Sequence, residues 1–161
     1  MQDRFEQLLT EIPMGRILGI DYGQQRIGVA LSDPSQMLSS TYKTFANKNS
    51  SAIVQEILSL VKEKNIVAII VGMPYNMNGT MGEKAEEVTD FIEEIRKQCS
   101  VPVVPWDERW TTKSAHNQLI NLGKSPSRNR ELVDRVAAAI ILQSFLDRLS
   151  HFRKKVQSLN L

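Results

Sequence analysis

A run of apolar residues in the middle of the chain most limits the folds that this sequence can adopt. Residues 66–73 have the sequence IVAIIVGM, and no polar residue interrupts Val67 to Val71. A strand with one face in water alternates apolar and polar residues, whereas a strand covered on both faces is apolar throughout. The run is too short to span a bilayer. It therefore predicts an inner strand of a sheet that has helices on both faces.

The segments before this run predict three strands that follow one another as a meander. Arg16 to Asp21 (RILGID) and Arg26 to Asp33 (RIGVALSD) are β-patterned. They are separated by Tyr22-Gly23-Gln24-Gln25, and a glycine in so short a connection predicts a hairpin. Residues 38–45 contain Thr and Tyr residues typical of strands and predict a third strand, at an edge of the sheet.

Helices and strands alternate after the meander. Apolar residues at helical spacing predict helices over residues 50–64, 85–95 and 112–122, and a last helix from 131 to about 149. Residues 101–106 predict a further strand. Three meandering strands followed by two crossover units predict an α/β fold, with a mixed five-stranded sheet and helices on both faces.

The length of 161 residues fits one domain. Residues 1–13 predict a short amphipathic helix that ends at Pro13, and we expect it to be an N-terminal helical appendage to a single domain over residues 14–161. The N-terminal residues include acids and lack an apolar signal-peptide core, and no apolar run is long enough to cross a membrane. These features predict a cytoplasmic protein without membrane contact.

Cysteine and histidine are too scarce for a metal site of the zinc type. The chain has one cysteine, Cys99, and two histidines, His116 and His151, which lie far apart in the sequence. This excludes an internal disulfide framework and a local zinc motif. Carboxylates are the remaining candidates for metal ligands.

Three carboxylates occur where predicted strands end or where the last helix begins. Asp21 closes an apolar strand, Glu108 directly follows the last strand, and Asp134 lies near the start of the last helix. Ligands collect outside the carboxyl ends of parallel strands, so these acids could converge at one edge of the sheet. Hard carboxylates suit Mg²⁺ or Mn²⁺, and such ions support phosphodiester hydrolysis.

Each of these acids also fits an ordinary structural role. Asp21 could pair with Arg16 or Arg26, or accept hydrogen bonds from the amides of the turn. Asp107, beside Glu108, or Thr111 could cap the next helix, predicted over residues 112–122. Asp134 would complement the dipole of the last helix, an effect of roughly 0.3–1 kcal/mol that needs no catalytic explanation.

The last third of the chain has features of a nucleic-acid interface. Residues 107–161 contain ten Lys/Arg and five Asp/Glu, whereas residues 1–106 contain ten Lys/Arg and thirteen Asp/Glu. We expect five cations to contact a nucleic-acid backbone beside the acids: Arg109, Lys113, Lys124, Arg128 and Arg130. A solvated loop with ordinary surface lysines is the alternative. Four aromatic residues could stack bases: Tyr22, Tyr75, Trp106 and Trp110. For Trp106, packing in the core is the better interpretation.

Four sequence blocks recur in order across residues 15–148. They are Gly19-Ile20-Asp21-Tyr22-Gly23 through Asp33; Val71-Gly72-Met73-Pro74 to Asn78-Gly79-Thr80; Asp107-Glu108-Arg109-Trp110-Thr111-Thr112; and Asp134-Arg135-Val136-Ala137-Ala138 to Ile141-Leu142-Gln143. In this order they resemble the signature of the YqgF family, also called RuvX, whose members are Holliday-junction-resolvase-like pre-16S rRNA nucleases.

The resemblance implies a ribonuclease H-like fold and a cytoplasmic, metal-dependent nuclease that matures the 5′ end of 16S rRNA. It assigns the family's three acidic residues to Asp21, Glu108 and Asp134, as catalytic residues and as ligands of Mg²⁺ or Mn²⁺. The partners it implies are pre-16S rRNA or branched DNA, with the ribosome as a further candidate, for a monomer or homodimer.

The chain departs from the family pattern at several positions. Asn78 replaces the usual Asp, and we interpret it as a turn residue. Met73 and Trp110 replace the usual Leu. Related resolvases carry one acid at the end of the fourth strand, where this chain has Gly72-Met73-Pro74.

The sequence leaves other functions open. One alternative is a Holliday-junction-type DNA resolvase, and another is a nucleic-acid-binding factor of transcription or ribosome assembly with little catalysis. A third is an ATP-binding protein, because Asp21-Tyr22-Gly23 resembles the first phosphate motif of the actin and sugar-kinase superfamily. Such proteins bind the nucleotide between two lobes, and 161 residues supply only one.

Overall fold

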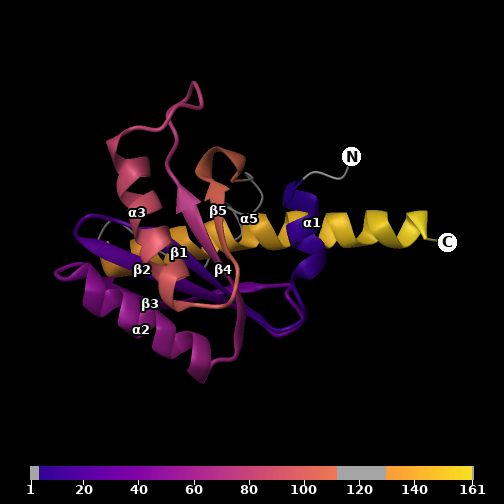
Figure 1. Cartoon of the computed structure of the whole chain (residues 1–161), viewed down its shortest axis with the longest axis horizontal. Coiled ribbons are helices and arrows are strands. Elements are labelled where there is room, and N and C mark those ends of the chain that lie inside the picture. The colour runs from indigo at the N-terminus through magenta and orange to yellow at the C-terminus, as the bar shows by residue number, and fades with distance from the viewer. Residues whose placement is uncertain (1–3, 112–129, 161) are drawn as a thin grey trace.

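The computed structural model describes residues 4–111 and 130–160, which form a layered α/β structure (Figure 1). Its elements follow in this order: α1 (Arg4–Glu11), β1 (Arg16–Tyr22), β2 (Arg26–Ser32), β3 (Ser39–Ala46), α2 (Ser50–Glu63), β4 (Ile66–Met73), α3 (Glu83–Gln98), β5 (Val103–Asp107), the 3₁₀ helix η1 (Glu108–Trp110) and α5 (Arg130–Leu159). The helix predicted over residues 112–122 lies outside the described residues.

The strands form one sheet in the order β3-β2-β1-β4-β5. The strand β1 pairs antiparallel with β2, and β2 pairs antiparallel with β3. On its other side β1 pairs parallel with β4, which in turn pairs parallel with β5. The predicted mixed five-stranded sheet, with its antiparallel meander, is therefore confirmed. The carboxyl ends of β1, β4 and β5 meet at one edge.

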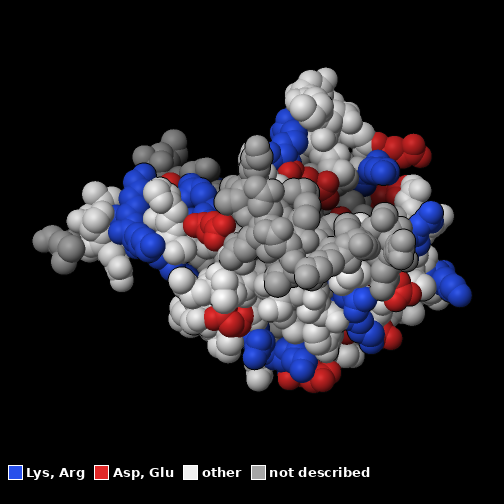
Figure 2. All heavy atoms as spheres, turned by 180° about the vertical axis from the view of Figure 1, so that it is seen from behind, with Lys and Arg blue, Asp and Glu red and all other residues white. Residues whose placement is uncertain are grey.

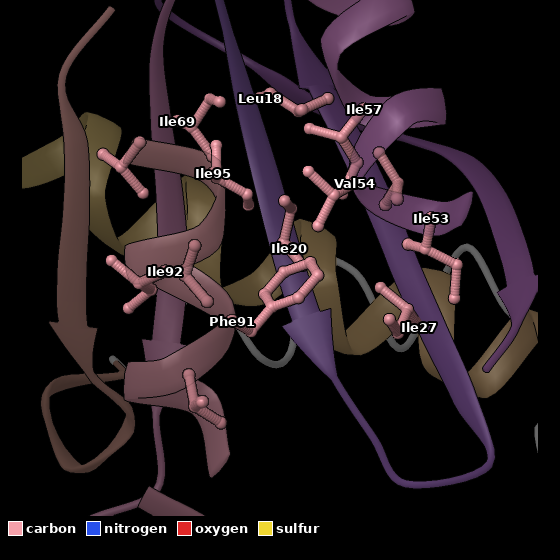
Figure 3. Packing of buried hydrophobic residues seen from close by; sticks show 14 of the residues in the cluster. Leu18, Ile20, Ile27, Ile53, Val54, Ile57, Ile69, Phe91, Ile92 and Ile95 are labelled. Atoms are coloured by element: carbon pink, nitrogen blue, oxygen red, sulfur yellow. The ribbon is translucent and has the colours of Figure 1, made fainter. Parts of the chain in front are cut away.

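Helices cover both faces of the sheet, as the apolar run over 66–73 predicts. Helices α2 and α3 lie in front of the sheet in Figure 1, and α5 crosses behind it. Alternate residues of β4 therefore enter different cores. Ile69 and Val71 pack with α2 and α3, in the cluster that Figure 3 shows from close by. Ala68 and Ile70 pack with α5 on the opposite face.

Helix α5 runs about ten residues beyond its predicted end, to Leu159. The reason is that apolar residues continue at helical spacing past Leu149 and pack against α1. Phe152 is 4% exposed, and Leu9 of α1, in the same cluster, is 1% exposed. The division into an appendage and one domain stays a prediction. Although α5 has 30 residues, neither it nor any other described helix is apolar over a length that could cross a membrane.

Candidate active site

The structure brings the three predicted acids to one pocket. Asp21 at the end of β1, Glu108 in η1 and Asp134 near the start of α5 all line a pocket of about 340 Å³. Lys84, in the first turn of α3, lines the same pocket. The pocket lies at the edge where β1, β4 and β5 end, which is where ligands of sheets with parallel strands collect.

A glycine on β2 allows Asp134 to approach Asp21. Asp21 pairs directly with Gly28 across the β1–β2 ladder, so positions 21 and 28 face the same side of the sheet. A Cβ atom at position 28 would lie 2.0 Å from the main-chain oxygen of Asp134. Helix α5 therefore rests directly on the backbone of β2 at this point, and no side chain separates it from the strand.

A second glycine leaves room for Glu108. A Cβ atom at Gly72, near the end of β4, would lie 2.9 Å from Oε1 of Glu108 and 2.6 Å from Cδ1 of Ile141. The Glu108 carboxylate therefore occupies the space in which a side chain at position 72 would stand. An acid that follows β5 in sequence thus reaches the end of β4, the place at which the family resemblance implies an acid in related resolvases.

Asp21 is half-buried and has no countercharge in contact. Its side chain forms no ion pair with any described residue. Burial, and then the negative charges of Glu108 and Asp134, raise the pKa of Asp21 from 3.8 to about 7, against the opposing effect of Lys84. Burial also raises the pKa of Glu108, again opposed by Lys84. The pocket therefore holds more negative charge than its surroundings compensate.

Arg16 and Arg26, the ion-pair partners that the sequence suggested for Asp21, contact other groups. Nε of Arg26 lies 2.7 Å from Oδ2 of Asp134, in a pair whose side chains are 30% and 21% exposed. Arg16 donates to the main-chain oxygen of Ser32 at 3.0 Å. The alternative in which Asp21 forms an ion pair with Arg16 or Arg26 is therefore wrong.

The donor set fits a hard divalent cation, but the three carboxylates do not form a complete metal site. Asp21 and Glu108 supply oxygen ligands, and the raised pKa of Asp21 reflects a charge that a cation would offset. Among the described residues, however, no three His, Cys, Asp or Glu side chains stand close enough together to hold a metal ion. Asp134 would have to release Arg26 to join the other two.

Asp107 and Arg109 hold η1 in place. The Asp107 side chain is 3% exposed and lies 2.6 Å, Oδ2 to Nη2, from Arg109. Asp107 also accepts a hydrogen bond from the Arg109 amide at 2.9 Å and so caps the 3₁₀ helix η1, whereas the helix that it was expected to cap lies outside the described residues. The Arg109 guanidinium donates to the main-chain oxygen of Met77 as well. Arg109, predicted to contact phosphates, is thus already engaged with protein groups.

The Asp107–Arg109 pair yields a prediction about stability. Asp107→Asn should lower the free energy of unfolding by about 1–3 kcal/mol, because it removes a buried charged partner and weakens the cap. Hydrogen bonds from Arg109 lower the pKa of Asp107. The stabilisation is therefore present above the ordinary pKa of an aspartate and is lost as the pH falls through the lower folded value.

Urea unfolding of both proteins between pH 2.5 and pH 7 checks this expectation. The two curves of stability against pH should converge at the acid end. Asp90→Asn, a change to an exposed acid of α3, is the control and should have little effect. Equal stabilities of wild type and Asp107→Asn at pH 7 would contradict the role assigned to the pair.

The other predicted phosphate contacts are only partly described. Lys113, Lys124 and Arg128 lie outside the described residues. Arg130 is the first residue of α5 and is exposed. Asn78 is confirmed as a turn residue, since its Oδ1 accepts a hydrogen bond from the Thr80 amide at 3.1 Å.

Sequence reasoning missed the roles of two cations in the pocket. Lys84 was not singled out, and Arg26 was considered only as a partner of Asp21. A signal for Lys84 exists in the sequence, because it stands in the first turn of a helix, where a cation opposes the helix dipole. No local pattern indicates that Arg26 pairs with a residue 108 positions further along the chain.

Comparison with known families and curated proteins agrees with these features. Residues 15–148 match the RuvX family, described as Holliday junction resolvase. A protein of Roseiflexus sp. (strain RS-1) is 42% identical over 133 residues, which are 83% of this chain and 94% of that protein. A protein of Clostridium acetobutylicum is 41% identical over 132 residues, 82% of this chain and 98% of that protein. Both are named "Putative pre-16S rRNA nuclease".

Solved structures confirm the predicted ribonuclease H-like fold. RuvC of Thermus thermophilus matches with a TM-score of 0.57 and 15% identity, over 84% of this chain and 96% of that one. The yeast mitochondrial Holliday junction resolvase also matches with a TM-score of 0.57 and 15% identity, over 98% of this chain and 92% of that one. At such identities the likeness concerns the fold alone.

Proposed function

The chain belongs to the RuvX family, and from this premise we propose that it is a divalent-metal-dependent nuclease that processes the 5′ end of pre-16S rRNA. As a member of this family the protein is a hydrolase acting on phosphodiester bonds. The observation that carries the finer proposal is the pocket itself. Acids from three distant segments, Asp21, Glu108 and Asp134, line it together with Lys84, and nearby charges do not offset the charge of the half-buried Asp21.

The residues of the pocket have distinct roles in this proposal. A bound Mg²⁺ or Mn²⁺ would activate a water molecule and stabilise the leaving oxygen. Asp21 at the end of β1 and Glu108 in η1, whose carboxylate lies over Gly72 of β4, would hold the ion. Asp134 would join them only by giving up its contact with Arg26, and the arginine would then be available to a phosphate oxygen. Lys84 supplies a second cation for the scissile phosphate, as a point charge.

A cleavage assay tests the proposal. The substrate is an RNA that spans the 5′ end of mature 16S rRNA and carries its precursor extension, incubated with Mg²⁺, with Mn²⁺ or with EDTA. We expect a product with the mature 5′ end in either metal and none in EDTA. No cleavage in both metals, or equal cleavage in EDTA, would contradict it.

Branched DNA is the second candidate substrate. It is favoured by the description of the matching family as Holliday junction resolvase. A four-way DNA junction in the same assay separates the two candidates. Preferential cleavage of the junction over the precursor RNA would replace the RNA substrate by DNA while leaving the hydrolytic site unchanged.

Binding of the metal should be visible without any substrate. We expect millimolar Mg²⁺ or Mn²⁺ to raise the Tm of the wild type, because the ion binds the folded pocket and offsets the charge that destabilises it. At a concentration 100 times the Kd the gain is about 2.7 kcal/mol in the free energy of unfolding. The shift should be absent in Glu108→Gln and retained in the control Asp90→Asn. Equal shifts in all three proteins would show that the ion binds elsewhere.

A further inference from the structure

A second pocket lies beside η1, and none of the three acids lines it. It has a volume of about 480 Å³ and lies between α1, η1 and α5. Its lining combines three aromatic residues with one hydroxyl, one acid and one cation: Phe5, Trp106, Trp110, Ser144, Asp147 and Arg148. Its volume lies within the range of pockets that bind small flat ligands. Nothing in the role assigned to the acidic pocket uses it.

Trp110 is exposed beside this pocket although it is a large aromatic residue. It is 56% exposed, whereas Trp106 beneath it is 4% exposed. The two rings meet edge to face, with centroids 5.0 Å apart. Ser144 fixes this arrangement, because its hydroxyl donates to the main-chain oxygen of Trp110 at 3.0 Å and accepts from Nε1 of Trp106 at 3.2 Å. The Trp110 ring is thus a supported, open platform, of the kind on which bases stack.

A basic stripe continues from the pocket along α5. Arg148, His151 and Lys155 follow at i, i+3 and i+7, which places them on one face of the helix, and Lys154 lies beside them. Asp147 is the one acid between residues 146 and 161. None of these lysine and arginine side chains forms an ion pair with another described residue. Figure 2 shows Lys and Arg side chains gathered over this C-terminal part of α5, at the left of the view.

The platform is close to the acids in space because it is close to one of them in sequence. Glu108 and Trp110 are two residues apart in η1, so their Cα atoms are separated by at most about 7.6 Å. Glu108 lines the acidic pocket and Trp110 lines the aromatic one. A strand bound at Glu108 can therefore bring a neighbouring nucleotide to Trp110.

We propose that the aromatic pocket and the basic stripe bind a single-stranded segment of nucleic acid next to the cleaved bond. One unpaired base stacks on Trp110 in the pocket, and the adjoining backbone follows Arg148 and Lys155 along α5. A paired base cannot enter, because both of its faces are stacked within the duplex. The inference rests on the proposed nuclease function and adds that the substrate has an unpaired segment beside the scissile phosphate.

Binding in EDTA tests the stacking contact apart from cleavage. The probes are fluorescein-labelled single strands of RNA and of DNA with one sequence, and a blunt duplex of the same length, with a gel to verify that the RNA stays intact. Trp110→Ala should weaken single-strand binding by about 5- to 160-fold, since stacking on an aromatic side chain contributes about 1–3 kcal/mol per base. Trp110→Phe should retain most of the affinity. Leu38→Ala, at another exposed apolar residue, is the control.

Salt dependence tests the basic stripe. Replacing Arg148 and Lys155 together by Gln should lower the slope of log K against log salt by about 1.4, because each lost phosphate contact on a single strand removes about 0.7. Replacing Lys48 and Lys62 by Gln serves as the control, since both are exposed outside the stripe. Duplex binding should respond less than single-strand binding to Trp110→Ala. A comparison of the affinities for the RNA and DNA single strands shows whether the site prefers ribose or deoxyribose.

The outcomes separate this inference from the proposed function. If Trp110→Ala and wild type bind both single strands equally, or if the wild type binds neither, the inference is overturned, even where precursor RNA is still cleaved normally. A Trp110-dependent affinity in a protein that cleaves nothing would instead contradict the nuclease proposal and leave the binding site standing.

Discussion

Asp21→Asn is expected to abolish cleavage and, in the same protein, to increase stability at pH 8. Loss of a metal-binding carboxylate removes several kcal/mol of transition-state stabilisation, so activity should fall by about 10³-fold. The substitution keeps the size of the side chain and removes its charge. It therefore separates the chemical role of Asp21 from its packing.

The gain in stability follows from the direction of the pKa shift. The folded pKa of Asp21 is raised to about 7 from 3.8. Between these values the folded protein holds a proton that the unfolded chain has released, so stability falls as the pH rises through this window and stays low above it. The rise of the pKa from 3.8 to about 7 corresponds to a loss of about 4 kcal/mol in the free energy of unfolding as an upper bound, and we expect about 1–3 kcal/mol after relaxation of the pocket. Asparagine carries no charge and avoids this cost.

Urea unfolding at pH 4 and pH 8 in EDTA, combined with the cleavage assay, measures both effects. Asp21→Asn should exceed the wild type in stability at pH 8 and nearly equal it at pH 4. Asp90→Asn should match the wild type in both assays. Undiminished cleavage by Asp21→Asn would remove Asp21 from the mechanism, and a loss of stability at pH 8 would show that its charge is already compensated in the fold.

Gly28→Ala should lower the stability of the protein more than a second glycine-to-alanine substitution, Gly72→Ala. The new Cβ would lie 2.0 Å from the main-chain oxygen of Asp134 and 2.4 Å from its carbonyl carbon. These atoms belong to the backbone of α5, which packs along the sheet and cannot yield as a side-chain end can. We expect a loss of at least about 3 kcal/mol in the free energy of unfolding. Any protein that still folds should lose cleavage activity, because Asp134 is displaced from the pocket.

Gly72→Ala is the matched comparison. Its Cβ would meet the ends of two flexible side chains, Cδ1 of Ile141 and Oε1 of Glu108. Rotation of these side chains relieves the contact, so stability should fall by only about 1 kcal/mol, whereas cleavage should fall because Glu108 is moved. Thermal unfolding of both variants checks the contrast. A Gly28→Ala protein as stable as Gly72→Ala would show that α5 does not rest on β2 as closely as the structure indicates.

Local patterns in the sequence were sufficient for most of the fold. The uninterrupted apolar run over 66–73 predicted a strand with two cores, and Ile69 and Ile70 do pack into opposite ones. Helix α2 begins after Asn49, a residue type that favours the cap position, and its side chain accepts hydrogen bonds from the amides of Ser51 and Ala52. Such features depend on residues within a few positions of one another. The end of α5 was missed because its last apolar residues pack against α1, a contact with the other end of the chain that local spacing does not reveal.

The three acids of the pocket show which features could be predicted from the sequence and which could not. The sequence determined which carboxylates end strands or begin a helix, and so it brought Asp21, Glu108 and Asp134 together as candidates. Only the tertiary structure decided that Asp134 pairs with Arg26, that Lys84 opposes the charge of the pocket, and that Glu108 reaches the end of β4 over Gly72. The physical reason is that periodicity and burial act over a few neighbouring residues, whereas the charge and shape of the pocket come from segments that meet only when α5 closes onto the sheet.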